Sequence, residues 1–431
     1  MLSDWLYFRG MKKMYRNLVL VSLLFLITLP GRALGQAPDD SVKIVFYNLL
    51  RFPGSTPTRA DSLEVIIDYI QPDILGVCEV NNASGADMVL TDALEDLDPD
   101  WAAAPYVDGP DTDAMLYFKE SQWGIDLVIE IPTALRSAMF YRVYYKDPNL
   151  AQHQDTTYLN FVLAHLKAGS DNSDETQRDQ EAAAIRNFLN TAELKGGLVA
   201  MGDWNLKRSS EPAYATLLNG SSYTLLDPIN RPGDWNANPS FADIHTQSTR
   251  TSQFGGGATG GLDDRFDIVL NSDSVQAGLG RWEYVDNSYL AVGNDGQHFN
   301  DALIDPPLNT SVPYPVLTAL YHMSDHLPVE MDLAVTLPAP AALANPSPAA
   351  LSLRVHATPD YLKVFPGNWQ NGKFSATLLD VNGRIVQQWQ PTHQNGTFAH
   401  RLPLSGTMAG GVYILRVQQQ GSVGHQRVVL R

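Results

Sequence analysis

The stretch Ser324-Asp325-His326-Leu327-Pro328-Val329 places a hydroxyl, a carboxylate and an imidazole directly before a predicted strand, LPVEMDLAV, that continues to Val335. The string is short enough to arise by chance, so its meaning depends on the sequence before it. Four further polar sites come earlier, each at the end of an apolar run: Asn48 after VKIVFY, Glu79 after DILGVC, His165 after NFVLA, and Asp203 with Asn205 after GLVAMG. Polar groups placed repeatedly at strand ends are how a layered α/β enzyme gathers one site from distant segments.

The rest of the first 335 residues alternates between strand and helix patterns. Leu63, Ile66, Ile67 and Ile70 recur at helical spacing before Pro72, and a second helix is predicted over 174–192 with one apolar stripe that would lie on a sheet. A helical segment is also expected around 88–97, and 206–262 is expected to be irregular. Strands are predicted at VKIVFY, ILGVCEV, AMLYF, DLVIEI, SAMFYRVYY, YLNFVLAHL, GLVAMGDWN, RFDIVLNS and LPVEMDLAV. This mixture favours a four-layer α/β sandwich, in which two packed mixed sheets are covered by helices on both outer faces.

Five of these stretches, FYNLL, GVCEV, LAHLKAG, GDWN and SDHLPV, with RFDIVL between the last two, resemble the endonuclease/exonuclease/phosphatase superfamily in kind and order. The resemblance covers about residues 41–335. That superfamily includes deoxyribonuclease I, apurinic endonucleases, inositol polyphosphate phosphatases and bacterial sphingomyelinases. The resemblance implies the same four-layer sandwich and metal-dependent hydrolysis of phosphoesters. Cys78 departs from the pattern, because many members carry glutamine before the metal-binding glutamate.

Hydrolysis of a phosphoester requires a divalent cation on the phosphate, a base for water, and donors for the developing charge. Magnesium prefers oxygen ligands and keeps several waters, so one or two carboxylates can hold it. Glu79 and Asp325 are the candidate metal ligands, and Asn48 at a strand end can orient a metal-bound water or the phosphate. Mn²⁺ and Ca²⁺ are the alternative ions.

The resemblance also implies roles for the remaining polar residues. Asp203 would position or deprotonate the attacking water, and Asn205, on the same face of an extended segment, would donate to a phosphate oxygen. His165 and His326 would flank the phosphate, and Asp267 in RFDIVL would orient His326. Lys167 is a candidate for substrate contact, with a solvated strand end as the equal alternative.

Several other polar residues are expected to have no catalytic role. Asp263 and Asp264 are expected to be loop or cap acids, and His298 and His322 to be structural. His245 and Arg250 could line a substrate groove, but surface loop positions are the preferred interpretation. The single cysteine, Cys78, excludes an intramolecular disulfide and is expected to be a buried thiol.

Charge is distributed unevenly along the chain. The total is −17, of which residues 1–40 contribute +2 and residues 351–431 contribute +6, so residues 41–350 carry −25. So acidic a unit repels polyanions at long range, which disfavours a general nucleic-acid-coating role. A nuclease is not excluded, because a local cationic groove or bound divalent ions can reverse the field near the site.

The two ends of the chain indicate export. Lys12, Lys13 and Arg16 precede the apolar stretch LVLVSLLFLITLP, and Ala33-Leu34-Gly35 offers a cleavage site, so residues 1–35 are predicted to be a signal peptide. An uncleaved membrane anchor is the alternative, although the apolar core is short for a span and no stable span is expected. Residues 336–350 form a Pro/Ala-rich linker.

Residues 351–431 are predicted to form a small all-β sandwich, with Asn382-Gly383 as a hairpin turn. Through LLDVNGRIV, LSGTMAGGVYILRV and the basic terminal strand, this segment resembles the C-terminal sorting domains of bacterial type IX secretion cargo. The resemblance implies the type IX machinery as a partner and a secreted or cell-surface location. A carbohydrate-binding or adhesive module is the competing interpretation.

Together these features predict a secreted, monomeric, metal-dependent phosphodiester hydrolase, with extracellular DNA or RNA as the leading substrate. The alternatives are a phosphodiesterase or phosphatase acting on lipid head groups or inositol phosphates, and a non-catalytic surface-binding protein on the same fold.

Overall fold

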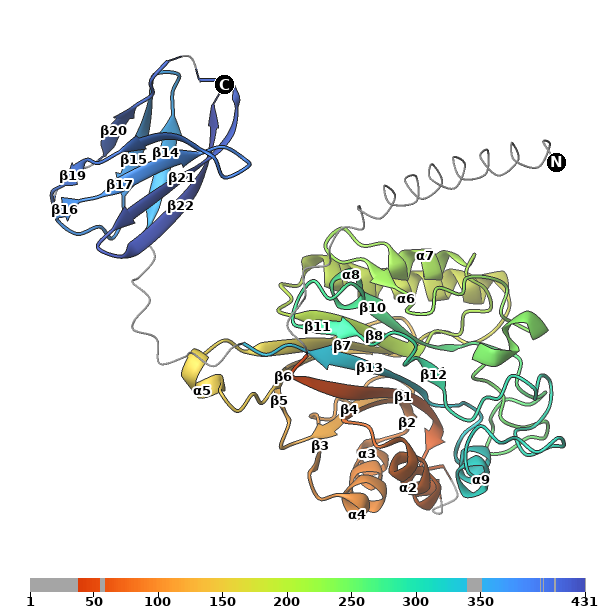
Figure 1. The fold of residues 1–431 in the computed structure, drawn as a ribbon. Helices are drawn as coiled ribbons and strands as arrows, with labels where there is room; N and C mark the ends of the chain where they lie inside the picture. The colour runs from red at the N-terminus through yellow and green to blue at the C-terminus, as the bar shows by residue number, and fades with distance from the viewer. Residues whose placement is uncertain are drawn as a thin grey trace, which may run out of the picture. The chain divides into compact units, whose positions relative to one another are not determined.

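A computed structural model describes residues 38–54, 59–338, 351–395, 397, 399–406 and 408–430, which fall into two compact units, one up to Pro338 and one from Ala339 onward (Figure 1). The predicted signal peptide and residues 339–350 of the predicted linker lie outside the described residues. Within the described part of the chain, no helix is long and apolar enough to cross a bilayer.

The first sheet of the larger unit has the strand order β11-β13-β1-β2-β4-β3, with β12 also paired to β13. Its strands are β1 (Asp40–Phe52), β2 (Ile74–Val80), β3 (Trp101–Ala103), β4 (Asp113–Lys119), β11 (Trp282–Tyr284), β12 (Leu290–Ala291) and β13 (Val329–Val335). Because β1 runs parallel to β2 and antiparallel to β13, the ends of β1 and β2 lie beside the start of β13.

The second sheet has the order β5-β6-β7-β8-β10-β9. Its strands are β5 (Trp123–Ile131), β6 (Ala138–Tyr145), β7 (Thr157–His165), β8 (Gly197–Asp203), β9 (Leu225–Leu226) and β10 (Asp267–Ser272). In the parallel pair β7 and β8, His165 is opposite Asp203, and in the antiparallel pair β8 and β10, Asp203 is opposite Asp267. The register alone therefore brings three predicted site residues to one edge.

Helices cover the outer face of each sheet (Figure 1). On the first sheet lie α2 (Arg59–Ile70), α3 (Ala83–Val89), the π-helical turn η1 (Leu90–Leu94), α4 (Glu95–Leu97) and α9 (Tyr314–Met323). On the second lie α6 (Asn172–Thr191) and α7 (Pro212–Leu218). The short helices α5 (Leu150–His153), η2 (Pro239–Ile244) and α8 (Asp273–Gln276) lie in connections. The predicted four-layer α/β sandwich is confirmed.

The patterns and the elements agree where the apolar spacing is regular. The predicted helices around Leu63–Ile70 and 174–192 are α2 and α6, because their apolar stripes pack on a sheet. The prediction of an irregular 206–262 is only partly right, since α7 and β9 interrupt it. Helix α9, directly before the SDHLPV stretch, was not predicted; it buries Leu317, Leu320 and Met323 against the first sheet.

The layer between the sheets supplies much of the unit's stability. Leu163 lies in this layer on β7 and is fully buried, whereas Leu279 is 77% exposed. We expect Leu163→Ala to destabilise the unit by about 2–5 kcal/mol, because it removes buried apolar contacts and leaves a cavity. Leu279→Ala, the same change on the surface, should stay within about 0.5 kcal/mol. Urea denaturation of both variants measures the difference, and equal losses would contradict this assignment of the core.

The C-terminal unit consists of antiparallel strands. Its sheets have the orders β14-β15-β20, β16-β19 and β18-β17-β21-β22. The strands are β14 (Leu353–Ala357), β15 (Tyr361–Pro366), β16 (Gly372–Lys373), β17 (Ser375–Leu379), β18 (Ile385–Trp389), β19 (Thr392–His393), β20 (His400–Pro403), β21 (Gly411–Gln419) and β22 (Ser422–Leu430). Leu362, Leu378 and Leu415 are fully buried in one core. The predicted all-β region is confirmed, and Asn382-Gly383 does connect two paired strands, with Gly383 at φ +77°.

Candidate active site

Asn48 connects the two sheets. It is fully buried at the end of the regular part of β1, and its Nδ2 donates to Glu79 Oε1 (3.0 Å) and to Asp203 Oδ2 (2.9 Å) on the other sheet. The same nitrogen lies 3.4 Å from His326 Nε2. Its Oδ1 accepts from the Leu50 N–H at 2.9 Å, which fixes the amide with its NH₂ toward the cluster. Asn48 therefore offers donors to the site, while its oxygen faces the backbone.

His326 and Asp267 form a buried pair. His326 Nδ1 lies 2.7 Å from Asp267 Oδ2, and its Nε2 lies 3.7 Å from Asp203 Oδ2. Burial alone would lower the pKa of His326, but the carboxylates of Asp267, Asp325 and Asp203 outweigh it and raise the pKa well above its ordinary value. The carboxylate that the family resemblance implied as the orienting group is thus in contact with the imidazole.

The pKa of His165 is shifted in the opposite direction from that of His326. Its Nε2 lies 3.4 Å from Asp203 Oδ2, and its Nδ1 lies 3.8 Å from Glu79 Oε1 without a hydrogen-bond partner. Burial lowers the pKa of His165 well below its ordinary value, and the positive charges of Arg136 and His326 lower it further. The two imidazoles therefore differ, one favouring the protonated form and the other the neutral form, on either side of Asp203.

Two site residues have left-handed backbone conformations. Glu79 has φ +59° and Asn205 has φ +51°, which are uncommon for residues with a side chain. The turn at Glu79 lets Oε2 accept the Arg51 N–H at 3.0 Å. The Nδ2 of Asn205 donates to the Leu166 carbonyl at 3.1 Å. Such local strain is common at functional sites, where surrounding contacts hold it in place.

Asp325 lies on the far side of His326. Its Oδ2 accepts the Ala258 N–H at 2.6 Å, while its Oδ1 lies 4.0 Å from His326 Nε2 and is buried without a hydrogen bond. The glycine-rich loop approaches so closely that a Cβ at Gly257 would lie 2.9 Å from Asp325 Cγ. A side chain at that position would push the loop off the carboxylate.

The donor set fits a divalent cation. Among the described residues, two groups bring ligand atoms within 4.8 Å of one another, Glu79–His165–Asp203 and Asp203–Asp267–His326. Within the same residues, no lysine or arginine pairs with the carboxylates of Glu79, Asp203, Asp267 or Asp325. Four clustered carboxylates with the His326 imidazole as their main positive neighbour are costly, so the cluster favours a bound cation. Asp325 belongs to neither group, so Glu79 and Asp325 do not occur together in one.

The structure places the other predicted residues outside this cluster. Lys167 Nζ lies 3.0 Å from Asp174 Oδ1 and donates to the Ala168 carbonyl, so its charge is used locally. The expectation that His245 and Arg250 are surface loop residues is wrong. Both are buried because the loop they occupy packs beneath the site: His245 Nε2 bonds the Trp235 carbonyl and Arg250 donates to the Ser324 carbonyl.

The remaining residues behave mainly as structural groups. His298 is bonded to Asp295 and to backbone carbonyls, and Asp264 accepts from Asn236 at 2.8 Å. Cys78 is buried, and desolvation raises the pKa of its thiol well above the ordinary value.

Four residues near the site were not singled out from the sequence. Gln247 Nε2 lies 2.7 Å from His326 Nε2 and 3.5 Å from Asp325 Oδ2. Arg51, near the end of β1, contacts Glu79, and Arg136, between β5 and β6, contacts the Leu166 carbonyl. Asp111 lies before β4 and contacts both arginines. Arg51 follows Asn48 by three residues, which is a usable signal, whereas Gln247, Asp111 and Arg136 occur in segments without any apolar periodicity.

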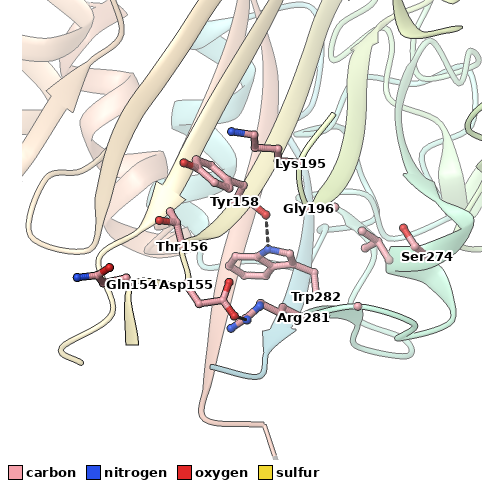
Figure 2. A pocket seen from close by; sticks show the side chains of 12 residues that line it. Gln154, Asp155, Thr156, Tyr158, Lys195, Gly196, Ser274, Arg281 and Trp282 are labelled. Atoms are coloured by element: carbon pink, nitrogen blue, oxygen red, sulfur yellow. Dashed lines mark hydrogen bonds and ion pairs between the residues drawn. The ribbon is translucent and has the colours of Figure 1, made fainter. Parts of the chain in front are cut away.

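A separate pocket of about 590 Å³ lies at the opposite ends of β7 and β8 (Figure 2). Tyr158, Lys195, Arg281 and Trp282 line it, and the Trp282 indole donates to the Tyr158 carbonyl at 2.8 Å. Its lining includes Tyr158 and Gly197, near the starts of the strands whose last residues, His165 and Asp203, belong to the cluster. The candidate cluster therefore lies at the other end of these two strands.

No protein-family model and no curated protein matches the sequence. Similar solved structures include D. rerio TDP2 complexed with single strand DNA product, 12% identical over 69% of this chain and 100% of that chain, with a TM-score of 0.46. The human Nocturnin catalytic domain with bound sulfate is 18% identical (69% and 95% covered, TM-score 0.42). An endonuclease/exonuclease/phosphatase family protein from Bacteroides thetaiotaomicron is 15% identical (69% and 99% covered, TM-score 0.42). At these identities and TM-scores, none of these likenesses assigns an activity to this chain.

Proposed function

We propose that the unit ending at Pro338 is a Mg²⁺-dependent phosphodiester hydrolase whose substrate is a nucleic acid, DNA or RNA. The observation that supports this most is the His326–Asp267 pair directed at Asp203, with Asn48 joining Asp203 to Glu79. This cluster combines a base, an oriented imidazole, an amide donor and a carboxylate suited to Mg²⁺ at the ends of both sheets. A non-catalytic binding protein on the same fold would be expected to have lost at least one of these groups.

The contacts suggest how the residues divide the reaction. Burial raises the pKa of Asp203, which makes its carboxylate a stronger base for a proton from the attacking water. His326, with Nδ1 held by Asp267, is oriented to donate from Nε2 to a phosphate or leaving-group oxygen. The phosphate oxygen would replace the Gln247 amide at that nitrogen. Glu79 would hold a divalent cation, and that ion would supply charge neutralisation on the phosphate, as such ions do in phosphoryl transfer.

A panel assay of the purified full chain tests this function. We expect cleavage of plasmid DNA or RNA and of bis-p-nitrophenyl phosphate with Mg²⁺, and no cleavage in excess EDTA. Turnover of sphingomyelin or inositol phosphates without nucleic-acid cleavage would replace the proposed substrate with lipid head groups or inositol phosphates. Turnover of no substrate in any metal would favour a non-catalytic binding protein.

We further propose that residues 351–431 are a sorting module for type IX export, as their sequence resemblance implies, so that the enzyme acts outside the cell or at its surface. Deleting these residues should leave an active enzyme trapped in the cell envelope, because the module would address the chain to the outer-membrane machinery. Activity in the medium and in the envelope fraction measures the outcome. Normal release of the truncated chain would exclude the sorting role and leave the proposed hydrolase activity untouched.

A further inference from the structure

Two arginines lie directly beside the cluster in this acidic unit. The backbone N–H of Arg51 in β1 donates to Glu79 Oε2. Arg136 lies in the connection between β5 and β6, and a nitrogen of its guanidinium donates to the Leu166 carbonyl at 3.2 Å. Leu166 follows His165 in the chain.

A single carboxylate holds the two arginines together. Arg136 Nε donates to Asp111 Oδ2 at 2.9 Å, and a guanidinium nitrogen of Arg51 lies 3.8 Å from Asp111 Oδ1. Two guanidiniums around one carboxylate leave a net charge of +1. The Arg136 side chain is 11% exposed and held by two contacts, whereas the Arg51 side chain is 55% exposed with one long contact. The Arg51 guanidinium can therefore turn toward an incoming anion and bind it.

This arrangement suits a phosphate next to the reacting one. A guanidinium binds phosphate oxygens in pairs and is more weakly hydrated than an ammonium. Asn48, Asp203 and His326, which contact one another, form the proposed position of the scissile phosphate. We propose that Arg51 and Arg136, tethered by Asp111, bind the phosphate that flanks the scissile phosphate on the same nucleic-acid strand. This inference deepens the proposed hydrolase function and rests on it.

The proposed subsite would offset the repulsion between the acidic larger unit and a polyanionic substrate. Residues 41–350 carry −25, so a polyanionic strand is repelled at long range and needs local positive charge to dock. A substrate with one isolated phosphate, such as bis-p-nitrophenyl phosphate, gains nothing from a second anion site. The arginine pair would therefore select strands over isolated phosphodiesters.

The test compares Arg51→Gln with wild type on a short single-stranded oligonucleotide and on bis-p-nitrophenyl phosphate. We expect kcat/KM on the oligonucleotide to fall at least about tenfold more than kcat/KM on bis-p-nitrophenyl phosphate, since a charge-assisted contact is lost only with the strand. The slope of log kcat/KM against log salt should become shallower by about 0.7 for the oligonucleotide. Arg51→Lys should restore part of the difference.

Arg281→Gln is the matched control, because Arg281 also pairs with one aspartate, Asp155, but lies in the pocket of Figure 2. It should leave the ratio between the two substrates unchanged. Equal losses on both substrates for Arg51→Gln, or no loss on either, would overturn the subsite.

A binding measurement separates this inference from the proposed activity. Anisotropy of a fluorescent single-stranded oligonucleotide in EDTA reports binding without turnover. Weaker binding by Arg51→Gln than by wild type and Arg281→Gln supports the subsite even if no substrate is hydrolysed. Identical binding by all three proteins would overturn the subsite even if hydrolysis is confirmed.

Discussion

Replacing His326 with alanine should lower kcat on nucleic acid and on bis-p-nitrophenyl phosphate by about 10²–10⁴-fold, the usual contribution of a positioned acid or base. The reason is geometric: the imidazole is fixed through Nδ1 by Asp267, and its Nε2 faces Asp203. Steady-state kinetics on both substrates measures the loss. A variant with near-normal turnover would show that the imidazole has no part in the chemistry.

Asp267→Asn provides the partner measurement. The amide keeps the shape of the carboxylate and one oxygen that can accept from Nδ1–H, but it removes the charge that favours the protonated imidazole. Because Asp267 acts through His326, the double variant should be little worse than His326→Ala alone. Losses that multiply would assign the two residues to separate tasks. Urea denaturation of each variant separates a folding defect from a catalytic one.

Glu79→Gln should raise the Mg²⁺ concentration for half-maximal activity by at least about 100-fold. Residues that merely support a metal ligand already change metal affinity by about 10–100-fold, and Glu79 is proposed to bind the ion directly. The glutamine keeps one oxygen to accept the Arg51 N–H or the Asn48 amide. Titration of activity with Mg²⁺ measures the shift, and Glu283→Gln, an exposed glutamate on β11 in the same sheet, is the control.

Stability gives this variant a second, independent readout. In EDTA, Glu79→Gln should be at least as stable as wild type, since it removes one of four carboxylates that lack a lysine or arginine partner within the described residues. Added Mg²⁺ should stabilise wild type more than the variant. Unchanged metal dependence in both readouts would place the ion elsewhere.

The sequence predicted the parts of this structure that depend on regular patterns. The apolar runs before Glu79, His165 and Asp203 become buried strands because alternating or continuous apolar residues fit a packed sheet. Since parallel strands end at one edge, the polar residues after them meet there, as expected from their order alone. Asp267 could be matched to His326 only through the family resemblance, because 59 residues separate them.

Other contacts had no local signal. Gln247 reaches His326 because the loop that carries it passes between the two halves of the site, and no spacing rule connects positions 247 and 326. The burial of Arg250 depends on the Ser324 carbonyl and on Phe254 and Tyr321, whose rings flank the guanidinium. The amide of Asn48 could be placed at a strand end from sequence, but which of its atoms faces the cluster depends on the Leu50 N–H.

The hydrogen bond from Asn48 to Asp203 has a consequence for how the two sheets could be separated. The strands of the second sheet, from Trp123 to Ser272, form one continuous insertion between strands of the first sheet. Neither sheet carries all of the site residues: the first sheet carries Asn48 and Glu79, and the second carries His165 and Asp203. We therefore expect no turnover from separate fragments that carry only one of the two sheets. Turnover should return only when the two sheets pack together again and restore the contact between Asn48 and Asp203.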